Sequence, residues 1–245
     1  MLPPPLPHQL DVLGRVHDRA TVAAADGGPP PVVIFGLDGV LFDTRPRTLR
    51  ILREYAEDVS FDYPDVAEGL RALELGQVHP LLSDTLREGG VTRADFVRDV
   101  VGFWHERYHA DDYVVHDEPN AGAAEYVRKL RGVGCCVAYL SRRDVPGMLL
   151  GTIAALRDHA FPVASPGVQL ALKPDATLSD DAFGRAVIPQ FAETGDVLAF
   201  FGSEVSSIEL ARASFPGADI ALVEISGGAP QPIEDLPVLR DFRSA

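Results

Sequence analysis

The sequence predicts an α/β protein with a doubly wound parallel sheet and a helical domain inserted after the first strand. From Pro119 onwards, short apolar runs alternate with segments of helical periodicity, which is the pattern of βαβ units in a parallel sheet. Between Arg45 and His116, several helical patterns occur but no convincing strand pattern. The run Val32–Phe35 is apolar and has prolines before it and glycines after it, which is typical of a strand buried on both faces.

The first 30 residues are expected to form an N-terminal arm and a linker. Met1–Pro7 is rich in proline and predicts an extended segment. His8–Ala25 places apolar residues at helical spacing and predicts a helix. Asp26–Pro31 contains only Asp, Gly and Pro, so it has the composition of a linker.

Residues 46–117 are expected to form the inserted helical domain. Helical periodicity predicts helices at Pro46–Ala56, Asp65–Leu75 and Thr92–Tyr108. Thr92 is the expected N-cap of the last of these, because an acidic residue follows three positions later as in a capping box. That helix carries an apolar stripe formed by Phe96, Val100, Phe103 and Trp104.

The sheet domain is expected to comprise residues 31–45 and 118–245. Its strands should be joined by right-handed helical crossovers. Gly227–Pro237 has the composition of a loop, and Val238–Phe242 predicts a short edge strand. The other expected elements are helices at Asn120–Gly132, Gly147–His159, Asp180–Phe191 and Ser206–Phe215, and strands at Val133–Leu140, Val168–Leu172, Val197–Phe201 and Ile220–Ile225.

Composition limits the functions and the cellular setting that we expect. The chain is 46% hydrophobic and 24% charged, as in soluble globular proteins, and no apolar run is long enough to span a bilayer. A net charge of -14 argues against binding to nucleic acid and to anionic membranes. The N-terminus lacks the features of a signal peptide. The adjacent Cys135 and Cys136 lie in an apolar run and predict reduced core residues rather than a redox pair, so we expect a cytoplasmic protein.

Acidic residues directly follow the first expected strand, at the edge of the sheet where ligands bind in open α/β folds. The stretch Ile34–Thr44 resembles the first motif of the haloacid dehalogenase (HAD) superfamily, an apolar strand followed by Asp-x-Asp-Gly-Val/Thr-Leu. The resemblance implies an aspartate nucleophile at the first acidic position and a general acid/base at the second. In this chain the nucleophile position is Gly36, and only the second aspartate is present, as Asp38.

Two further stretches resemble the second and third HAD motifs. Val137–Ser141 is an apolar strand that ends in a hydroxyl residue, and Ala171–Pro174 contains a lysine followed by proline. A hydroxyl and backbone amides at a strand end suit a phosphate oxygen. The resemblance implies that Ser141 binds phosphate and that Lys173 holds the negative charges of carboxylate and phosphate together. The remaining expected phosphate-binding residues are Leu37, Gly39 and Arg142.

The fourth motif departs from the HAD pattern in either of two registers. After the strand Val197–Phe201, HAD enzymes carry acidic residues that bind Mg²⁺. In one register Ser203 and Ser207 occupy the acidic positions, and in the other Gly202 replaces the first acid while Glu204 remains. The resemblance implies a Mg²⁺ cofactor, for which Asp38 and Glu204 are the remaining candidate ligands. We therefore expect Mg²⁺ binding to be weakened or absent.

These departures predict a HAD-like protein of phosphatase type that is catalytically impaired. Gly36 has no side chain with which to form the covalent intermediate of this family. With fewer carboxylates, the crevice is expected to attract a phosphorylated small molecule or another anion. One alternative is an active Mg²⁺-dependent phosphatase in which Asp38 activates water. Another is a structural or interaction protein with a vestigial pocket and a protein partner. The inserted domain would set specificity, with candidates His79, Trp104, His105 and Tyr108.

Overall fold

The computed structural model describes residues 4–224 and 236–244, and these form two compact units. The first, which we call the sheet unit, consists of Met1–Asp43, Pro119–Pro146 and Leu156–Ala245. The second, the helical unit, consists of Thr44–Glu118 and Gly147–Ala155. The helical unit thus takes in a short segment from the second half of the chain that the sequence had placed with the sheet.

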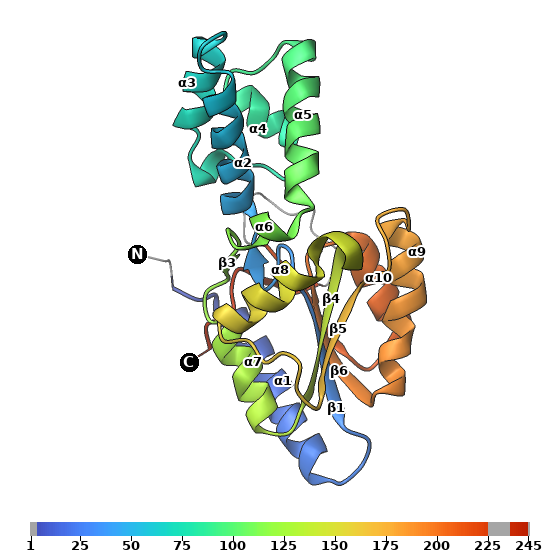
Figure 1. Ribbon diagram of the computed structural model, residues 1–245. Coiled ribbons are helices and arrows are strands. Elements are labelled where there is room, and N and C mark those ends of the chain that lie inside the picture. Colours follow the sequence, from blue (N-terminus) through green and yellow to red (C-terminus); the bar gives the residue numbers. More distant parts are fainter. Residues whose placement is uncertain (1–3, 225–235, 245) are drawn as a thin grey trace. The chain divides into compact units, whose positions relative to one another are not determined.

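The sheet unit is built on a six-stranded parallel sheet with the order β5-β4-β1-β6-β7-β8 (Figure 1). The chain runs outward from β1 in both directions, so the carboxyl end of β1 lies at the switch point of a doubly wound fold. The predicted fold class is confirmed. The strands are β1 Pro31–Gly36, β4 Cys136–Asp144, β5 Val168–Lys173, β6 Asp196–Gly202, β7 Asp219–Val223 and β8 Val238–Leu239.

Helices cover both faces of this sheet, which explains why its central strand is apolar throughout. The residues of Val32–Phe35 are fully buried. In Figure 1, α1 (Pro7–Ala25) and α7 (Ala123–Gly132) cover one face of the sheet. On the other face, α9 (Asp180–Val187) and α10 (Val205–Ser214) pack on an apolar cluster with β1 and β6. Period-2 strand geometry sends alternate apolar residues to each of these two cores.

The N-terminal helix is part of the sheet unit and is not a separate arm. The predicted helix is present as α1, and its residues Leu13, Val16 and Ala20 are fully buried. The buried hydroxyl of Tyr126 in α7 donates a hydrogen bond to the Leu13 carbonyl at 3.0 Å. Arg19 forms an ion pair with Asp219 of β7. The apolar stripe of α1 would face water in a free arm, so burial against the core is the favourable arrangement.

The helical unit has its own apolar core, to which α2, α3, α4 and α5 contribute. α5 begins at Ala94, and Arg93 stands at the N-cap without a capping side-chain hydrogen bond. The prediction of Thr92 as N-cap was therefore wrong; Asp95 of the first turn pairs instead with Arg93. The helices of the insertion are α2 Arg45–Asp58, α3 Pro64–Ala72, η1 Leu75–Gln77, α4 Leu82–Glu88, α5 Ala94–Tyr108 and α6 Asp111–Val114.

Several boundaries differ from the sequence predictions. α8 (Val145–Asp158) starts two residues earlier than expected, and β4 continues four residues beyond its expected end. The helix expected at 180–191 ends at Val187 and continues as the 3₁₀ helix η2 (Ile188–Glu193), because proline at the second position of η2 cannot donate to an α-helical ladder. Two short strands, β2 (Phe42–Asp43) and β3 (Glu118–Pro119), pair with each other.

The C-terminal predictions are tested in part. The expected edge strand is present as β8, parallel to β7 at one edge of the sheet. The loop expected at 227–237 lies mainly outside the described residues.

The two cysteines are free, and burial raises the pKa of the Cys135 thiol to about 12. Cys135 thus lies in the core as predicted, whereas Cys136 is only partly buried.

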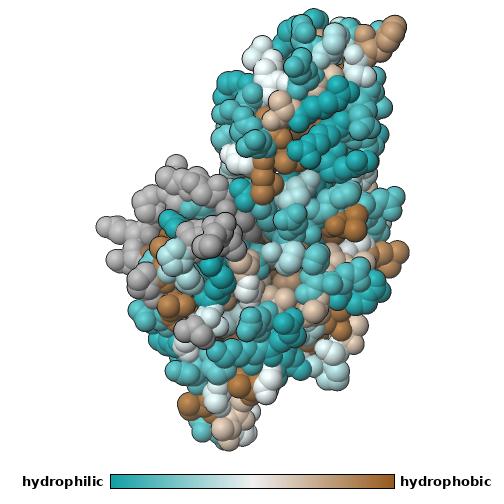
Figure 2. Space-filling view, turned by 90° about the vertical axis from the view of Figure 1, so that its left-hand side faces the viewer, coloured by the Kyte–Doolittle hydropathy of each residue, from teal (hydrophilic) through white to brown (hydrophobic). Residues whose placement is uncertain are grey.

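The surface carries mostly polar residues on the face drawn in Figure 2. Exposed apolar side chains also occur in the described part of the chain, and the most exposed of these are Phe61, Leu150, Val115 and Leu81. Within the same residues, no helix is both long enough and apolar enough to cross a membrane.

Candidate functional site

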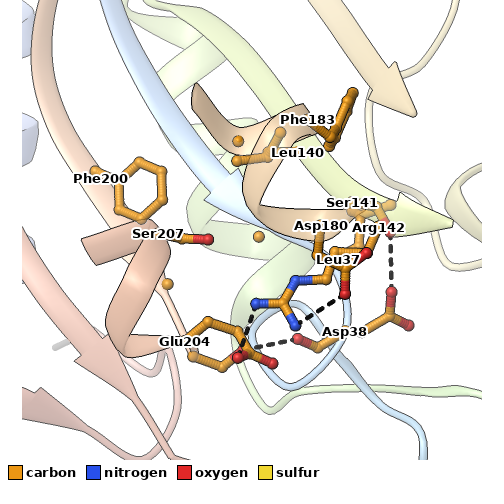
Figure 3. Close-up of a pocket in the computed structure, with 14 residues that line it drawn as sticks. Leu37, Asp38, Leu140, Ser141, Arg142, Asp180, Phe183, Phe200, Glu204 and Ser207 are labelled. Atoms are coloured by element: carbon orange, nitrogen blue, oxygen red, sulfur yellow. Dashed lines mark hydrogen bonds and ion pairs between the residues drawn. The ribbon is translucent and has the colours of Figure 1, made fainter. Parts of the chain in front are cut away.

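A pocket of about 80 Å³ opens at the carboxyl ends of β1, β4 and β6 (Figure 3). One part of its lining is apolar or glycine and comprises Gly36, Leu37, Leu140, Phe183, Gly184, Phe200 and Gly202. The other part is charged or hydroxylated and comprises Asp38, Ser141, Arg142, Asp180, Ser203, Glu204 and Ser207. The structure therefore brings together most of the residues that the motifs had singled out.

Gly36, the position of the expected nucleophile, is the last residue of β1. A Cβ atom added there would lie 2.9 Å from Cγ2 of Val40 and 3.6 Å from the carbonyl oxygen of Phe201. Val40 is fully buried, and its branched side chain has few alternative rotamers. A side chain at position 36 would therefore require Val40 to move.

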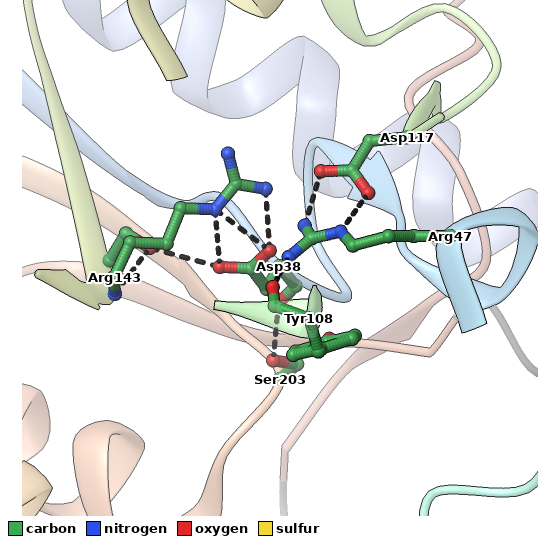
Figure 4. Close-up of polar contacts among 7 residues, drawn as sticks. Asp38, Arg47, Tyr108, Asp117, Arg143 and Ser203 are labelled. Carbon is green, nitrogen blue, oxygen red and sulfur yellow. Dashed lines mark hydrogen bonds and ion pairs between the residues drawn. The ribbon is translucent and has the colours of Figure 1, made fainter. Parts of the chain in front are cut away.

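Asp38 is held by three contacts from Arg143, and this arginine was not among the predicted phosphate-binding or catalytic residues. The Arg143 Nε lies 3.1 Å from each carboxylate oxygen of Asp38, and its Nη2 lies 2.6 Å from Oδ1 (Figure 4). The Ser141 hydroxyl donates a further hydrogen bond to Oδ2 of Asp38 at 2.9 Å. Charge-assisted bonds of this forked type are short and directional.

The extension of β4 explains why Arg143 reaches Asp38. β4 continues to Asp144, but its register with β5 shifts between Leu140 and Asp144. In this irregular end of the strand, both Ser141 and Arg143 contact Asp38. The amide of Arg143 also donates to the Ser141 hydroxyl oxygen at 3.2 Å. The sequence analysis ended this strand at Leu140. Regular strand periodicity could not have identified this contact, because the register of β4 shifts over 141–143.

The backbone of the loop after β1 is occupied by the chain's own hydrogen bonds. The Leu37 amide donates to the Leu140 carbonyl at 3.1 Å, and the Gly39 amide donates to the Phe42 carbonyl at 2.9 Å. Gly39 has a φ of +71°, which favours glycine and allows the chain to turn there. The predicted role of the Leu37 and Gly39 amides as phosphate donors is thus not supported, because both amides already have acceptors.

Glu204, Arg142, Asp180 and Lys173 form a chain of ion pairs beside the pocket. Arg142 Nη2 lies 2.8 Å from Glu204 Oε2, and Nη1 lies 3.4 Å from Asp180 Oδ2 (Figure 3). Lys173 Nζ lies 3.0 Å from Asp180 Oδ1. Lys173 is therefore ion-paired with Asp180, and it is absent from the pocket lining.

The charges of the ion-paired side chains around the pocket balance. Three cationic side chains, Arg142, Arg143 and Lys173, are each ion-paired to a carboxylate, and the carboxylates are Asp38, Asp180 and Glu204. The expected excess of positive potential is therefore not found among these six residues. An anion that enters the pocket has to compete with a carboxylate of the protein.

The donor set does not fit Mg²⁺. Both carboxylate oxygens of Asp38 accept hydrogen bonds, and its carbonyl oxygen accepts one from the Ser203 hydroxyl at 3.0 Å. Glu204 is paired with Arg142. Over residues 4–224 and 236–244, no three His, Cys, Asp or Glu side chains are grouped to hold a metal ion. Mg²⁺ demands oxygen ligands in near-octahedral geometry, and these oxygens face N–H and O–H donors instead.

The second register of the fourth motif places its first acidic position at Gly202, and a side chain has no room there. A Cβ atom at Gly202 would lie 2.6 Å from Cε1 of Phe200, so the ring occupies the space of a side chain at that position. Ser203 and Ser207 line the pocket as hydroxyl groups. Glu204, the acidic position that the second register keeps, also lines the pocket.

Comparison with solved structures identifies the class of fold, which is that of the haloacid dehalogenase-like hydrolases. A candidate phosphatase from Clostridium difficile has a TM-score of 0.52 at 18% identity, over 84% of this chain and 93% of that chain. A candidate haloacid dehalogenase-like hydrolase from Bacteroides fragilis has a TM-score of 0.51 at 15% identity, over 84% and 93%. The resemblance inferred from the motifs is therefore confirmed at the level of the fold.

The same fold is also found in a protein with a different named activity. Protein Tyrosine Kinase A from Mycobacterium tuberculosis has a TM-score of 0.52 at 18% identity, over 86% of this chain and 94% of that chain. No protein-family model matches the chain, and no curated protein matches its sequence. Identities this low establish the fold alone, so the function has to be argued from the site.

Proposed function

We propose that this protein is a phosphatase-type member of the HAD superfamily that binds a small anion without hydrolysing it through an aspartyl intermediate. The observation that carries the proposal is the glycine at position 36, where Val40 fills the space beside the backbone. The aspartyl reaction needs a carboxylate oxygen there to attack phosphorus and form the covalent intermediate. Loss of such a nucleophile typically lowers the rate by several orders of magnitude.

Arg142 is the cation that we assign to the anion. Its side chain is 37% exposed, and its partners Asp180 and Glu204 are 43% and 51% exposed. Ion pairs at this exposure contribute little to stability, so a ligand can replace these carboxylates at small cost. A guanidinium binds a phosphate through two parallel hydrogen bonds. A phosphorylated small molecule is therefore the ligand class that we expect.

Catalysis by Asp38 is the first alternative. In that reaction Asp38 would activate water directly with the help of Mg²⁺. Arg143 and Ser141 already donate to both of its oxygens, so water would have to compete for them. The third reading, an interaction protein with a vestigial pocket and a protein partner, remains a prediction. A cytoplasmic location and the absence of nucleic-acid and membrane partners also remain predictions.

The test combines a turnover assay with a binding assay. Purified protein is incubated with p-nitrophenyl phosphate and a panel of phosphorylated metabolites in the presence of Mg²⁺. We expect phosphate release no faster than that of Asp38→Asn. Binding of p-nitrophenyl phosphate is then measured by calorimetry, and we expect Arg142→Gln to weaken it at least tenfold. Arg185→Gln is the matched control, since Arg185 is also an ion-paired arginine but is absent from the pocket lining.

The outcomes separate the three readings. Turnover by the wild-type protein that disappears in Asp38→Asn would contradict the proposal and favour the active phosphatase. Equal and negligible binding by the wild-type protein and Arg142→Gln would favour the interaction protein.

A further inference from the structure

We propose that Arg143 is a resident cation that takes the place of a divalent metal ion at Asp38. This inference goes beyond the proposed function, because it concerns the cation at the site and does not depend on which ligand binds. It follows from three features of the structure: the contacts to the carboxylate of Asp38, the contact to its carbonyl oxygen, and the burial of Arg143.

The cation that neutralises the carboxylate of Asp38 is the guanidinium of Arg143. The guanidinium contacts both oxygens, at 3.1 Å from Nε and 2.6 Å from Nη2 to the nearer one (Figure 4). The Ser141 hydroxyl takes a further acceptor direction of Oδ2. A metal ion at these oxygens would meet the hydrogens of a cationic group and would be repelled by its charge.

The carbonyl oxygen of Asp38 is the atom through which the HAD resemblance mainly implies that this residue binds a metal ion. Here the Ser203 hydroxyl donates to it at 3.0 Å. Ser203 stands at one of the positions where the HAD pattern expects an acidic residue. A hydrogen-bond donor thus stands where the pattern expects an acceptor. Ser203 covers the carbonyl oxygen of Asp38 as Arg143 covers its carboxylate, and both groups would otherwise be able to ligate a cation.

Burial distinguishes Arg143 from the neighbouring Arg142. The Arg143 side chain is 2% exposed, whereas that of Asp38 is 33% exposed. A buried guanidinium without a carboxylate partner is strongly unfavourable, so Arg143 and Asp38 are held together by the cost of separating them. Arginine also keeps its charge over the whole physiological pH range. The positive charge at Asp38 is therefore permanent and cannot be removed by a chelator.

The experiment measures Mn²⁺ binding by electron paramagnetic resonance, with Mn²⁺ as the probe of the divalent-cation site. Four forms are compared: the wild type, Asp38→Asn, Arg143→Gln, and the double variant of these two substitutions. We expect the wild type and Asp38→Asn to bind Mn²⁺ equally weakly. Arg143→Gln uncovers the Asp38 oxygens and is expected to bind at least tenfold more tightly than the double variant.

Arg143→Lys is the matched control, because it keeps a cation at the site and should bind Mn²⁺ as weakly as the wild type. Its comparison with the wild type and Asp38→Asn decides the question even if Arg143→Gln does not fold. Wild-type Mn²⁺ binding at least tenfold tighter than that of Asp38→Asn would overturn the inference. So would the absence of any gain in a folded Arg143→Gln. Failure of anion binding at Arg142 would leave these results unaffected, so the two proposals fail separately.

Discussion

At the scale of single residues, the pocket contains most of the motif positions but not Lys173, and their contacts differ from the HAD pattern. Asp38, Ser141, Arg142 and Glu204 line one pocket, as their order in the sequence predicted. Motif spacing places residues at strand ends, and adjacent parallel strands bring those ends together. It does not determine which cation reaches which carboxylate. That depends on how β4 ends, and for this reason the contact between Arg143 and Asp38 was not predicted.

A substitution at Gly36 tests the closed space beside β1. We expect Gly36→Asp to destabilise the protein by about 1–3 kcal/mol, because the new Cβ atom forces Val40 from its buried position. Gly36→Ala adds the same Cβ atom without the carboxylate and should cost about as much. Chemical denaturation measures both effects. We also expect no phosphatase activity in either variant, since Arg143 still holds Asp38. Turnover in Gly36→Asp that is absent from Gly36→Ala would contradict this expectation.

At the scale of elements, periodicity identified most helices and strands but not what they pack against. The helix at 8–25 was expected from its apolar spacing, and α1 is present there. Its role as one layer of the sheet unit depends on α7 and β7, which lie more than 100 residues later in the chain. Some predicted boundaries were wrong. The helix expected at 180–191 changes to a 3₁₀ helix at η2, where helical periodicity continues but a proline interrupts the α-helical hydrogen bonds.

The start of α2 contains a buried ion pair whose removal can be predicted. Arg47 Nε donates to Oδ1 of Asp117 at 2.7 Å, and its Nη1 donates to the carbonyl oxygen of Tyr108 at 2.8 Å; both charged side chains are fully buried (Figure 4). We expect Arg47→Met to lower the free energy of unfolding by about 3–5 kcal/mol, because it leaves the Asp117 carboxylate buried without its guanidinium partner.

The matched control is Arg50→Met in the same helix, where the arginine is half exposed and its pair with Glu54 is 3.9 Å long. We expect a change within about 0.5 kcal/mol for this control. The double variant Arg47→Met/Asp117→Asn should lose less than the sum of its two single changes, because neither charge is then left buried alone. Additive losses in urea unfolding would argue against coupling between the two side chains.

At the scale of the whole molecule, each of the two units contains apolar core residues of its own. The sequence predicted the doubly wound sheet and an all-helical insertion, because the spacing of apolar residues within each segment distinguishes strands from helices. It could not predict that 147–155 groups with the helical unit, since grouping depends on contacts between segments that are distant in the chain.

Separate cores predict that a core substitution loosens one unit more than the other. Leu13→Ala removes a fully buried side chain of the sheet unit and should cost about 2–5 kcal/mol. By hydrogen exchange, we expect faster exchange in β1 and α7, with protection in α2 and α5 largely kept. Val22→Ala in the same helix is the control, because Val22 is well exposed. Equal acceleration in both units would show that they open as one cooperative body.

The adjacent cysteines have a practical consequence for labelling. Cys135 is buried, with its thiol donating to the Pro31 carbonyl at 3.4 Å, whereas Cys136 is half-buried. Alkylating reagents attack the thiolate, which a thiol with a pKa of about 12 barely forms at neutral pH. A maleimide dye on the native protein should therefore attach to Cys136. Slow modification of Cys135 would then measure the rate at which the chain around it separates from β1.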